Sequence, residues 1–329
     1  MIRQGETDMS FDLILPFLRP IEPLLLDDKI SEIMGNPDST WWFERDGTLD
    51  QANICFPAEG LRTGLEVVAN KLGKKLNEDS PLLHAQLPDG SRLAAVIPPV
   101  VRPAPAVIIR KFSSRKFTVD DLINRGTLTR EMAEYLSEQV EIGKTILISG
   151  GTGTGKTTLL NILAQSIPNR ERIVTIEDTA ELYIQKPNVV ATECQTDTHK
   201  AHVSFDDLLK GSLRWRPDRI ILGEVRGVEA RTLLDSFNTG HSGSLATIHA
   251  NSATKALRRF ANLVMRSHQQ ARIEDIEAEI SEAVDLVIHI ERQPSRRAVR
   301  EVVQLTGYDR RLQQFVCEQV FPARIGVVA

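Results

Sequence analysis

The sequence has few cysteines, and their placement excludes two classes of small domain. Its 329 residues include three cysteines, Cys55, Cys194 and Cys317, which lie far apart and form no C-x-x-C pair. A disulfide framework needs an even set of paired cysteines, and a zinc ribbon needs closely spaced pairs. The cysteine pattern predicts neither, and it indicates a protein of a reducing compartment.

Long apolar runs are also lacking. Ala94–Val101 is among the longest, but prolines interrupt it. It is far shorter than the roughly 20 apolar residues that cross a bilayer as a helix. The first residues show no basic stretch followed by an apolar one, which would be the pattern of a secretory leader. We therefore expect neither a secreted nor an integral membrane protein.

An excess of positive charge is the third feature that the sequence lacks. The formal net charge is −4, and no basic stretch is interleaved with aromatic side chains. Proteins that bind nucleic acids usually gather lysine and arginine on one surface or place aromatic rings for base stacking. The composition therefore gives no strong case for direct nucleic-acid binding.

The length and the order of the patterns predict two domains. In residues 1–112, a hairpin around Asp46-Gly47 and a helical face from Leu61 to Leu72 precede further short strands. They predict a small α+β N-terminal domain with an antiparallel sheet. The adjacent Trp41 and Trp42 on one hairpin strand must face opposite sides, so one of them should lie in the core. Residues 113–125 are polar and basic without sustained periodicity, and they are interpreted as a linker.

Residues 126–329 show strands that alternate with helices, which is typical of an α/β domain with a mostly parallel sheet. We expect strands at 145–149, 172–176, 219–222 and 244–248, and helices between and after them at 204–213, 230–237, 253–266 and 273–283. Three further strands at 286–292, 299–305 and 313–321 should close the chain as a meander.

The strongest motif follows the first of these strands. Gly150 to Thr157, with the sequence GGTGTGKT, fits the phosphate-loop pattern G-x-x-x-x-G-K-[ST] without a gap. Glycines let successive backbone N–H groups turn toward an anion, lysine reaches the β- and γ-phosphates, and the hydroxyl ligates Mg²⁺. A strand before the loop and a helix after it complete the expected context. The predicted nucleotide-binding residues are Gly151, Thr152, Gly153, Thr154, Gly155, Lys156, Thr157 and Thr158.

Three more strands are followed by reactive side chains. Glu177 and Asp178 follow one strand, Glu224 and Arg226 the next, and His249 the third. Because ligands of open parallel sheets bind beyond the carboxyl ends of the strands, these groups should gather at one edge. Glu224 occupies the place of a Walker B acid, which holds the shell of Mg²⁺ or orients the attacking water, and Glu177 and Asp178 are a second acidic source. His249 can hydrogen-bond the γ-phosphate.

Each of these residues also has a structural interpretation. Glu177 or Asp178 can cap the next helix, Glu224 can pair with Arg226 on the surface, and His249 can be a core histidine with satisfied hydrogen bonds. The repeated placement at strand ends beside a phosphate loop favours the catalytic interpretation.

Four segments in order resemble the Walker A, Asp, Walker B and His boxes of the secretion traffic ATPases. They are GGTGTGKTT, IEDTAEL, RWRPDRIILGEVRGVEA and NTGHSGSLATIHAN. The segments DDKISEIMGNPDSTWWFERDGTL and PDGSRLAAVIPPVVRPAPAVIIRKF resemble the N-terminal domain of the same family. The sequence is most similar to the type IV secretion ATPases of conjugal DNA transfer.

This resemblance implies a RecA-like P-loop ATPase domain after the N-terminal domain, and a homohexamer at the cytoplasmic face of the inner membrane. It implies ATP as substrate, with Mg²⁺ held by Thr157 and, partly through water, by Asp178 and Glu224. Arg92 and Arg110 match the N-terminal arginines that approach the phosphates in the family, and Arg226 matches one that reaches a neighbouring site. Inner-membrane components and the coupling protein of a secretion channel are the implied partners.

The resemblance predicts an ATP-hydrolysing motor that energises conjugal transfer or pilus biogenesis. Type II secretion and pilus-extension relatives usually carry a four-cysteine metal module, which three dispersed cysteines cannot build. A pilus-retraction motor of the same superfamily is the nearest alternative. An assembly scaffold that binds ATP with little turnover is the alternative of another class, and the sequence leaves open which acid activates the water.

Overall fold

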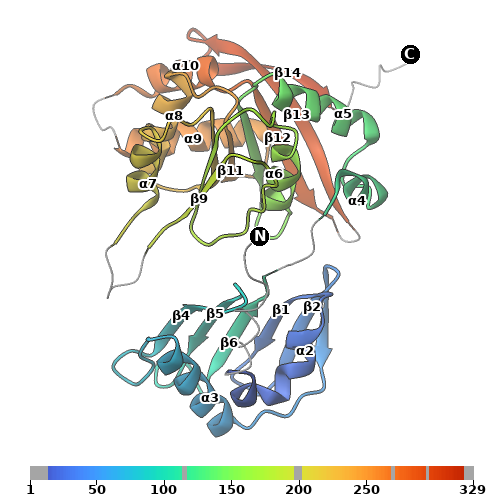
Figure 1. The fold of residues 1–329 in the computed structure, drawn as a ribbon, viewed down its shortest axis with the longest axis vertical. Coiled ribbons are helices and arrows are strands. Elements are labelled where there is room, and N and C mark those ends of the chain that lie inside the picture. The colour runs from blue at the N-terminus through green and yellow to red at the C-terminus, as the bar shows by residue number, and fades with distance from the viewer. Residues whose placement is uncertain (1–13, 113–116, 196–201, 268–270, 294–295, 322–329) are drawn as a thin grey trace. The chain divides into compact units, whose positions relative to one another are not determined.

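The computed structural model describes residues 14–112, 117–195, 202–267, 271–293 and 296–321. The chain forms two compact units, Met1–Lys116 and Phe117–Ala329. Each unit has its own sheet and its own hydrophobic core (Figure 1). None of the helices in the described ranges combines the length and the apolar content needed to cross a membrane.

The first unit contains an antiparallel sheet of six strands in the order β3-β2-β1-β6-β5-β4. The strands are β1 (Ile30–Gly35), β2 (Trp41–Arg45), β3 (Thr48–Ala52), β4 (Leu82–Gln86), β5 (Arg92–Val96) and β6 (Ala106–Arg110). Its helical elements are η1 (Leu15–Phe17), η2 (Arg19–Ile21), α2 (Glu22–Leu26) and α3 (Ala58–Lys71).

The core of this unit follows from helical spacing on α3 and alternation on the strands. Leu61, Leu65 and Val68 are buried on one face of α3. Trp41 is 1% exposed and stacks on Phe56 with ring centroids 5.8 Å apart. Trp42, the next residue, is only half-buried, so the prediction that one of the two tryptophans lies in the core is confirmed.

The second unit contains a sheet of eight strands in the order β14-β13-β12-β7-β11-β10-β8-β9. The pairs from β12 to β9 are parallel, and β13 and β14 add antiparallel to β12. The strands are β7 (Ile146–Gly150), β8 (Ile173–Glu177), β9 (Val189–Glu193), β10 (Arg219–Val225), β11 (Leu245–His249), β12 (Leu286–Arg292), β13 (Arg297–Asp309) and β14 (Gln314–Phe321). The helices are α4 (Val119–Asn124), α5 (Arg130–Glu141), α6 (Lys156–Ala164), α7 (Phe205–Ser212), α8 (Glu229–Asn238), α9 (Ala253–Ser267) and α10 (Ile273–Ala283).

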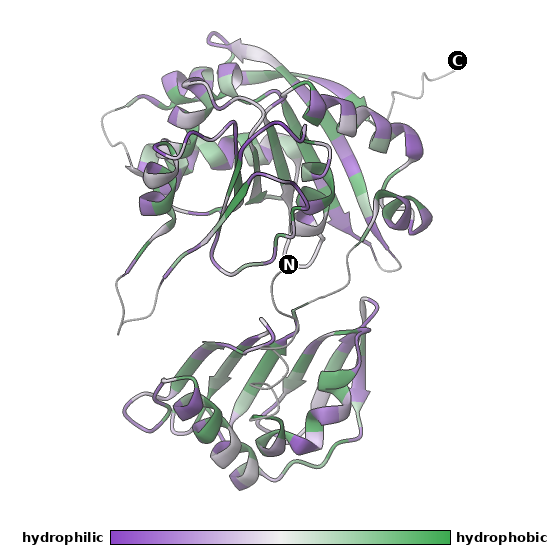
Figure 2. Ribbon diagram, viewed as in Figure 1, coloured by the Kyte–Doolittle hydropathy of each residue, from purple (hydrophilic) through white to green (hydrophobic). Residues whose placement is uncertain are grey.

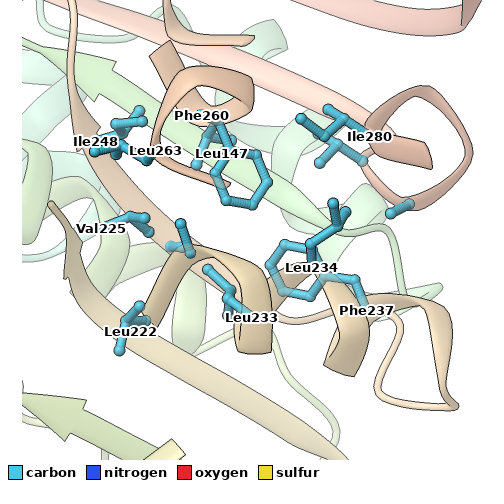
Figure 3. Packing of buried hydrophobic residues seen from close by; sticks show 14 of the residues in the cluster. Leu147, Leu222, Val225, Leu233, Leu234, Phe237, Ile248, Phe260, Leu263 and Ile280 are labelled. Atoms are coloured by element: carbon cyan, nitrogen blue, oxygen red, sulfur yellow. The ribbon is translucent and has the colours of Figure 1, made fainter. Parts of the chain in front are cut away.

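Helices cover both faces of this sheet, so its central strands are apolar on both sides. Leu147 faces the cluster formed with α7 to α10, which Figure 3 shows from close by. Ile146 and Ile148 face the cluster formed with α4 to α6. Figure 2 shows the same arrangement as hydrophobic strands beneath helices with hydrophilic outer faces. The expected α/β architecture is confirmed.

The structure differs from the expectations in four places. Strands β1, β4 and β9 were not predicted. Residues 119–124, which were expected to belong to a linker, form α4 and bury Leu122 in the core of the second unit. Thr118 and Asp121 close a capping box at its start, so this part of the polar stretch is helical. The expected linker residues 113–116 lie outside the described residues.

Candidate functional site

The phosphate loop connects the buried strand β7 to helix α6. Gly155 has φ +95° and stands at the N-cap of α6, and Gly153 has φ +69°, so both adopt a left-handed backbone that glycine tolerates. At Gly150 a Cβ atom would lie 2.4 Å from the carbonyl oxygen of Ile290 on the neighbouring strand β12. The first glycine of the motif is therefore required by packing, and the two later ones by the path of the loop.

Lys156 is held against the inside of this loop. Its side chain is 7% exposed, and Nζ donates hydrogen bonds to the carbonyl oxygens of Gly151 at 2.8 Å and Gly150 at 3.2 Å. The hydroxyl of Thr154 donates to the Gly151 carbonyl oxygen at 3.0 Å. The ammonium group thus stands over the loop, with Thr157 and Thr158 half-buried in the first turn of α6.

Three of the predicted residues form a continuous chain of contacts. His249 ends β11 directly beside Gly150 of β7, and its Nδ1 lies 3.4 Å from Lys156 Nζ. Its Nε2 lies 3.4 Å from Glu224 Oε1. Burial and the neighbouring Lys156 charge lower the pKa of His249, while Glu224 acts in the opposite direction. His249 is therefore neutral at pH 7 and links the lysine to the carboxylate.

The sequence pattern indicated that Glu224 follows its strand. In the structure it lies inside β10, which extends to Val225. The pairing of β10 with β11 is interrupted between Leu222 and Val225, where the register shifts. This irregularity leaves the Glu224 side chain 33% exposed near the end of an otherwise buried strand. Glu224 is thereby accessible to both solvent and His249.

Glu177 makes structural contacts with the loop that follows β8, but it does not cap a helix, since residues 178–188 contain none. It is 4% exposed at the end of β8, and its Oε1 accepts hydrogen bonds from the backbone N–H groups of Glu181 at 2.8 Å and Leu182 at 2.9 Å. Its Cγ lies against Gly223, so it is next to β10. Burial raises the pKa of Glu177 to about 7, although the two backbone hydrogen bonds act in the opposite direction.

This shifted pKa predicts how stability depends on pH. The unfolded chain releases the Glu177 proton near 4.5, whereas the folded protein holds it to about 7, so stability falls as the pH rises through this interval. Glu177→Gln keeps an acceptor oxygen and removes the titration. The free energy of unfolding of the variant relative to wild type should rise by about 2 kcal/mol between pH 5 and pH 8. Urea unfolding at both pH values measures it.

Glu134→Gln is the matched control for this measurement, because Glu134 is exposed on α5. It should leave the difference from wild type unchanged between the two pH values. A Glu177→Gln effect of the same size at pH 5 and pH 8 would contradict the assignment of the shifted pKa.

Asp178 and Arg226 contact each other across the loops that follow β8 and β10. Arg226 Nη2 lies 2.9 Å from Asp178 Oδ1, and the guanidinium is 5.2 Å from the centroid of the Phe205 ring. Both charged side chains remain partly exposed. Asp178 was expected near the metal and Arg226 near a neighbouring copy. The ion pair holds both side chains at the same edge of the sheet as Glu224.

The two predicted arginines of the first unit are neighbours in its sheet. Arg92 of β5 and Arg110 of β6 stand opposite each other in the strand register. Arg110 also faces Glu32 of β1, with 3.7 Å between its Nε and the nearest carboxylate oxygen. The first unit therefore presents two guanidinium groups on adjacent strands.

Sequence reasoning missed two arginines of the second unit. Arg297 Nε donates a hydrogen bond to the carbonyl oxygen of Gly153 at 3.0 Å. Arg292 is paired with Arg297 across β12 and β13. Its Nη1 would lie 3.8 Å from a Cβ atom placed on Gly153, so it also stands beside the loop. Arg292 ends a fifth parallel strand at this edge, so the strand-end argument applied to β12 would have found it.

Known proteins are similar to this chain in sequence. Residues 18–327 match the family described as Type II/IV secretion system protein. The chain is 38% identical over 288 residues to the conjugal transfer protein TrbB of Rhizobium radiobacter, covering 86% of each protein. It is 32% identical over 330 residues to the type IV secretion system protein VirB11 of Bartonella quintana, covering 88% of this chain and 92% of that relative.

A solved structure shows the same fold. The X-ray structure of the Legionella pneumophila ATPase DotB matches with a TM-score of 0.61 at 20% identity, covering 91% of this chain and 82% of that one. The resemblance that the four sequence boxes indicated is confirmed by the family match and by these relatives. Because the match spans nearly the whole sequence, the chain belongs to the Type II/IV secretion system protein family.

Proposed function

We propose that this chain is a hexameric motor that hydrolyses ATP to ADP and phosphate and thereby energises a type IV secretion or conjugal DNA transfer system. The observation that carries the proposal is the contact chain Lys156–His249–Glu224 beside a complete phosphate loop. The names of the relatives, conjugal transfer protein TrbB and type IV secretion system protein VirB11, give the system served. The second unit is then a RecA-like P-loop ATPase domain.

The residues of the site have distinct tasks in this proposal. Loop N–H groups and the Lys156 ammonium bind the phosphates, because the lysine can exchange its loop carbonyl acceptors for phosphate oxygens. The Glu224 carboxylate orients the attacking water, since it is exposed and stands at the end of the sheet where ligands bind. Neutral His249 donates from Nε2 toward Glu224 and accepts at Nδ1, which fixes the carboxylate relative to the lysine.

Mg²⁺ fits the donors at this edge. Among the described residues no three His, Cys, Asp or Glu side chains converge as a closed metal site. An ion that bridges nucleotide phosphates needs only one or two protein oxygens besides water. Thr157 would supply its hydroxyl, and Glu224 and Asp178 would act through water, with Arg226 holding Asp178 in place. The ion would neutralise charge on the β- and γ-phosphates.

Three arginines are proposed to act on phosphates from outside the second unit of their own chain or on a neighbouring copy. Arg92 and Arg110 are proposed to approach the phosphates from the N-terminal domain, because adjacent guanidinium groups bind oxyanions well. Arg226 is proposed to act toward the site of a neighbouring copy in a homohexamer. The assembly would act at the cytoplasmic face of the inner membrane, with inner-membrane components and the coupling protein of the channel as partners.

Phosphate release and a mating assay test the proposal together. Purified protein should release phosphate from ATP in the presence of Mg²⁺ and lose this activity when EDTA removes the metal. In a donor strain that lacks the gene, the wild-type gene should restore conjugal transfer. Binding of ATP without turnover would favour the assembly scaffold, and restored pilus retraction without DNA transfer would favour the retraction motor.

A further inference from the structure

The second unit has a polar cavity at the end of the sheet that is opposite the phosphate loop. The cavity has a volume of about 520 Å³ and lies where β8, β9 and β10 begin. Its charged lining consists of Arg170, Arg172, Arg216, Arg219, Glu171 and Asp218. The residues that line the ATP site follow the other ends of the same strands, so the two sites are separate.

The charges of this cavity do not balance. Four guanidinium groups face two carboxylates. Glu171 is engaged by Arg219 in an ion pair, and Asp218 accepts a hydrogen bond from the backbone N–H of Arg172 at 2.6 Å. Two positive charges therefore remain without a counter-charge in the lining.

One of these arginines is largely buried and keeps one donor nitrogen for the cavity. Arg219 is 3% exposed; its Nε contacts Glu171, and its Nη1 donates to the carbonyl oxygen of Gly243 at 2.9 Å. Within the described part of the chain no acceptor contacts its Nη2. This nitrogen is not among the enclosed side-chain atoms that lack a partner in the described residues, so it is open to the cavity and can donate to an oxyanion there.

Two further arginines at the cavity have no partner among the residues that the structure describes. Arg170 and Arg216 are exposed, and neither makes a hydrogen bond or an ion pair there. Arg216 has φ +54°, a left-handed conformation, although it precedes Pro217. The residue before a proline is normally extended, so this conformation is strained, and strain of this kind often marks a functional position.

We infer that this cavity binds a small phosphorylated anion. Guanidinium groups bind phosphate oxygens through paired hydrogen bonds, and the two uncompensated charges match a doubly charged phosphate group. The volume lies within the range of pockets that hold small ligands. This inference does not rest on ATP hydrolysis, because no residue of the cavity belongs to the phosphate loop.

Calorimetric titration with inorganic pyrophosphate tests the inference on the full-length chain. Wild type should bind pyrophosphate at two sites, and Lys156→Ala should retain only the one remote from the phosphate loop. The double variant Arg170→Ala/Arg216→Ala should bind pyrophosphate in the cavity at least tenfold more weakly, because two charge-assisted contacts are removed. If Lys156→Ala fails to fold, Arg170→Ala/Arg216→Ala is compared with wild type instead. It should then bind pyrophosphate at one site rather than two.

The matched control is Arg130→Ala/Arg311→Ala, which removes the same charge from exposed positions outside the cavity. It should leave both sites intact, and equal weakening in this control would reduce the effect to net charge and overturn the inference. Failure of pyrophosphate to bind Lys156→Ala would also overturn it. Succinate provides a second arm, because tighter binding of this dicarboxylate than of pyrophosphate would exclude a phosphate ligand.

Discussion

Lys156→Ala is expected to abolish measurable ATP turnover and to weaken ATP binding by about 10- to 100-fold. The variant removes the ammonium group that the loop carbonyls of Gly150 and Gly151 now hold over the phosphate site. Charge-assisted hydrogen bonds of this kind contribute about 1.5–3 kcal/mol each, which corresponds to this range of affinity. Equilibrium binding of a fluorescent ATP analogue and a phosphate-release assay measure the two effects.

Lys210→Ala is the matched control, because Lys210 is an exposed lysine on α7 that pairs with Asp206 in its own helix. It should leave binding and turnover near wild type. Arg297→Ala should weaken ATP binding less than Lys156→Ala does. It removes only the hydrogen bond from Arg297 Nε to the Gly153 carbonyl oxygen. Turnover near wild type in Lys156→Ala would contradict the assignment of the site.

Glu224→Gln is expected to lower the rate of ATP hydrolysis at saturation by about 10²- to 10⁴-fold while ATP binding is retained. The amide keeps the size of the side chain and its contact distance to His249, but it has no negative charge to orient or polarise water. Binding is preserved because Lys156 and the loop N–H groups are unchanged. Single-turnover phosphate release, compared with ATP binding on the same preparation, separates the two steps.

Glu177→Gln decides which acid acts on the water. Glu177 is buried, and one of its oxygens already accepts two backbone hydrogen bonds. Its replacement by an amide should therefore cost much less activity at pH 7 than Glu224→Gln. If the two variants lost activity equally, Glu177 would belong to the catalytic groups, and unchanged turnover in Glu224→Gln would remove Glu224 from them.

Much of the second unit could be predicted because its signals are local. The phosphate loop is a contiguous motif, and the strands before Asp178 and His249 are short apolar runs in an alternating pattern. Parallel strands end at the same edge, which is enough to gather Lys156, Glu224 and His249. Their contacts at 3.4 Å could not be predicted, since they depend on side-chain orientation and on the irregular pairing near Glu224.

The missed elements have weaker or interrupted patterns. Strand β1 contains a register shift between Ile30 and Glu32, which breaks the alternation that identifies a strand. Strand β9 lies at the edge of its sheet and has no fully buried residue. Helix α4 has only six residues, but the capping pair Thr118 and Asp121 was present in the sequence as a signal.

The arginine-lined cavity could not be predicted from the sequence. Its lining comes from residues 142–143, 170–172, 188, 216, 218–219, 240 and 242, whose separations in the sequence follow no pattern. Arg216 was noticed in the sequence only as part of the family pattern RWRPD. Arg170 precedes β8, and its relation to the buried Arg219 appears only when the starts of β8 and β10 are placed side by side by their parallel pairing.

The close approach of Gly150 to Ile290 has a consequence for the order of folding during synthesis. Strand β7 lies between β11 and β12, and β12 leaves the ribosome more than a hundred residues after β7. Until then one edge of β7 has no partner, and joining the distant strands requires closure of a long loop. A nascent chain therefore carries the complete phosphate-loop sequence long before β12 can pack against it. We expect the loop to reach its final conformation only after β12 has been synthesised.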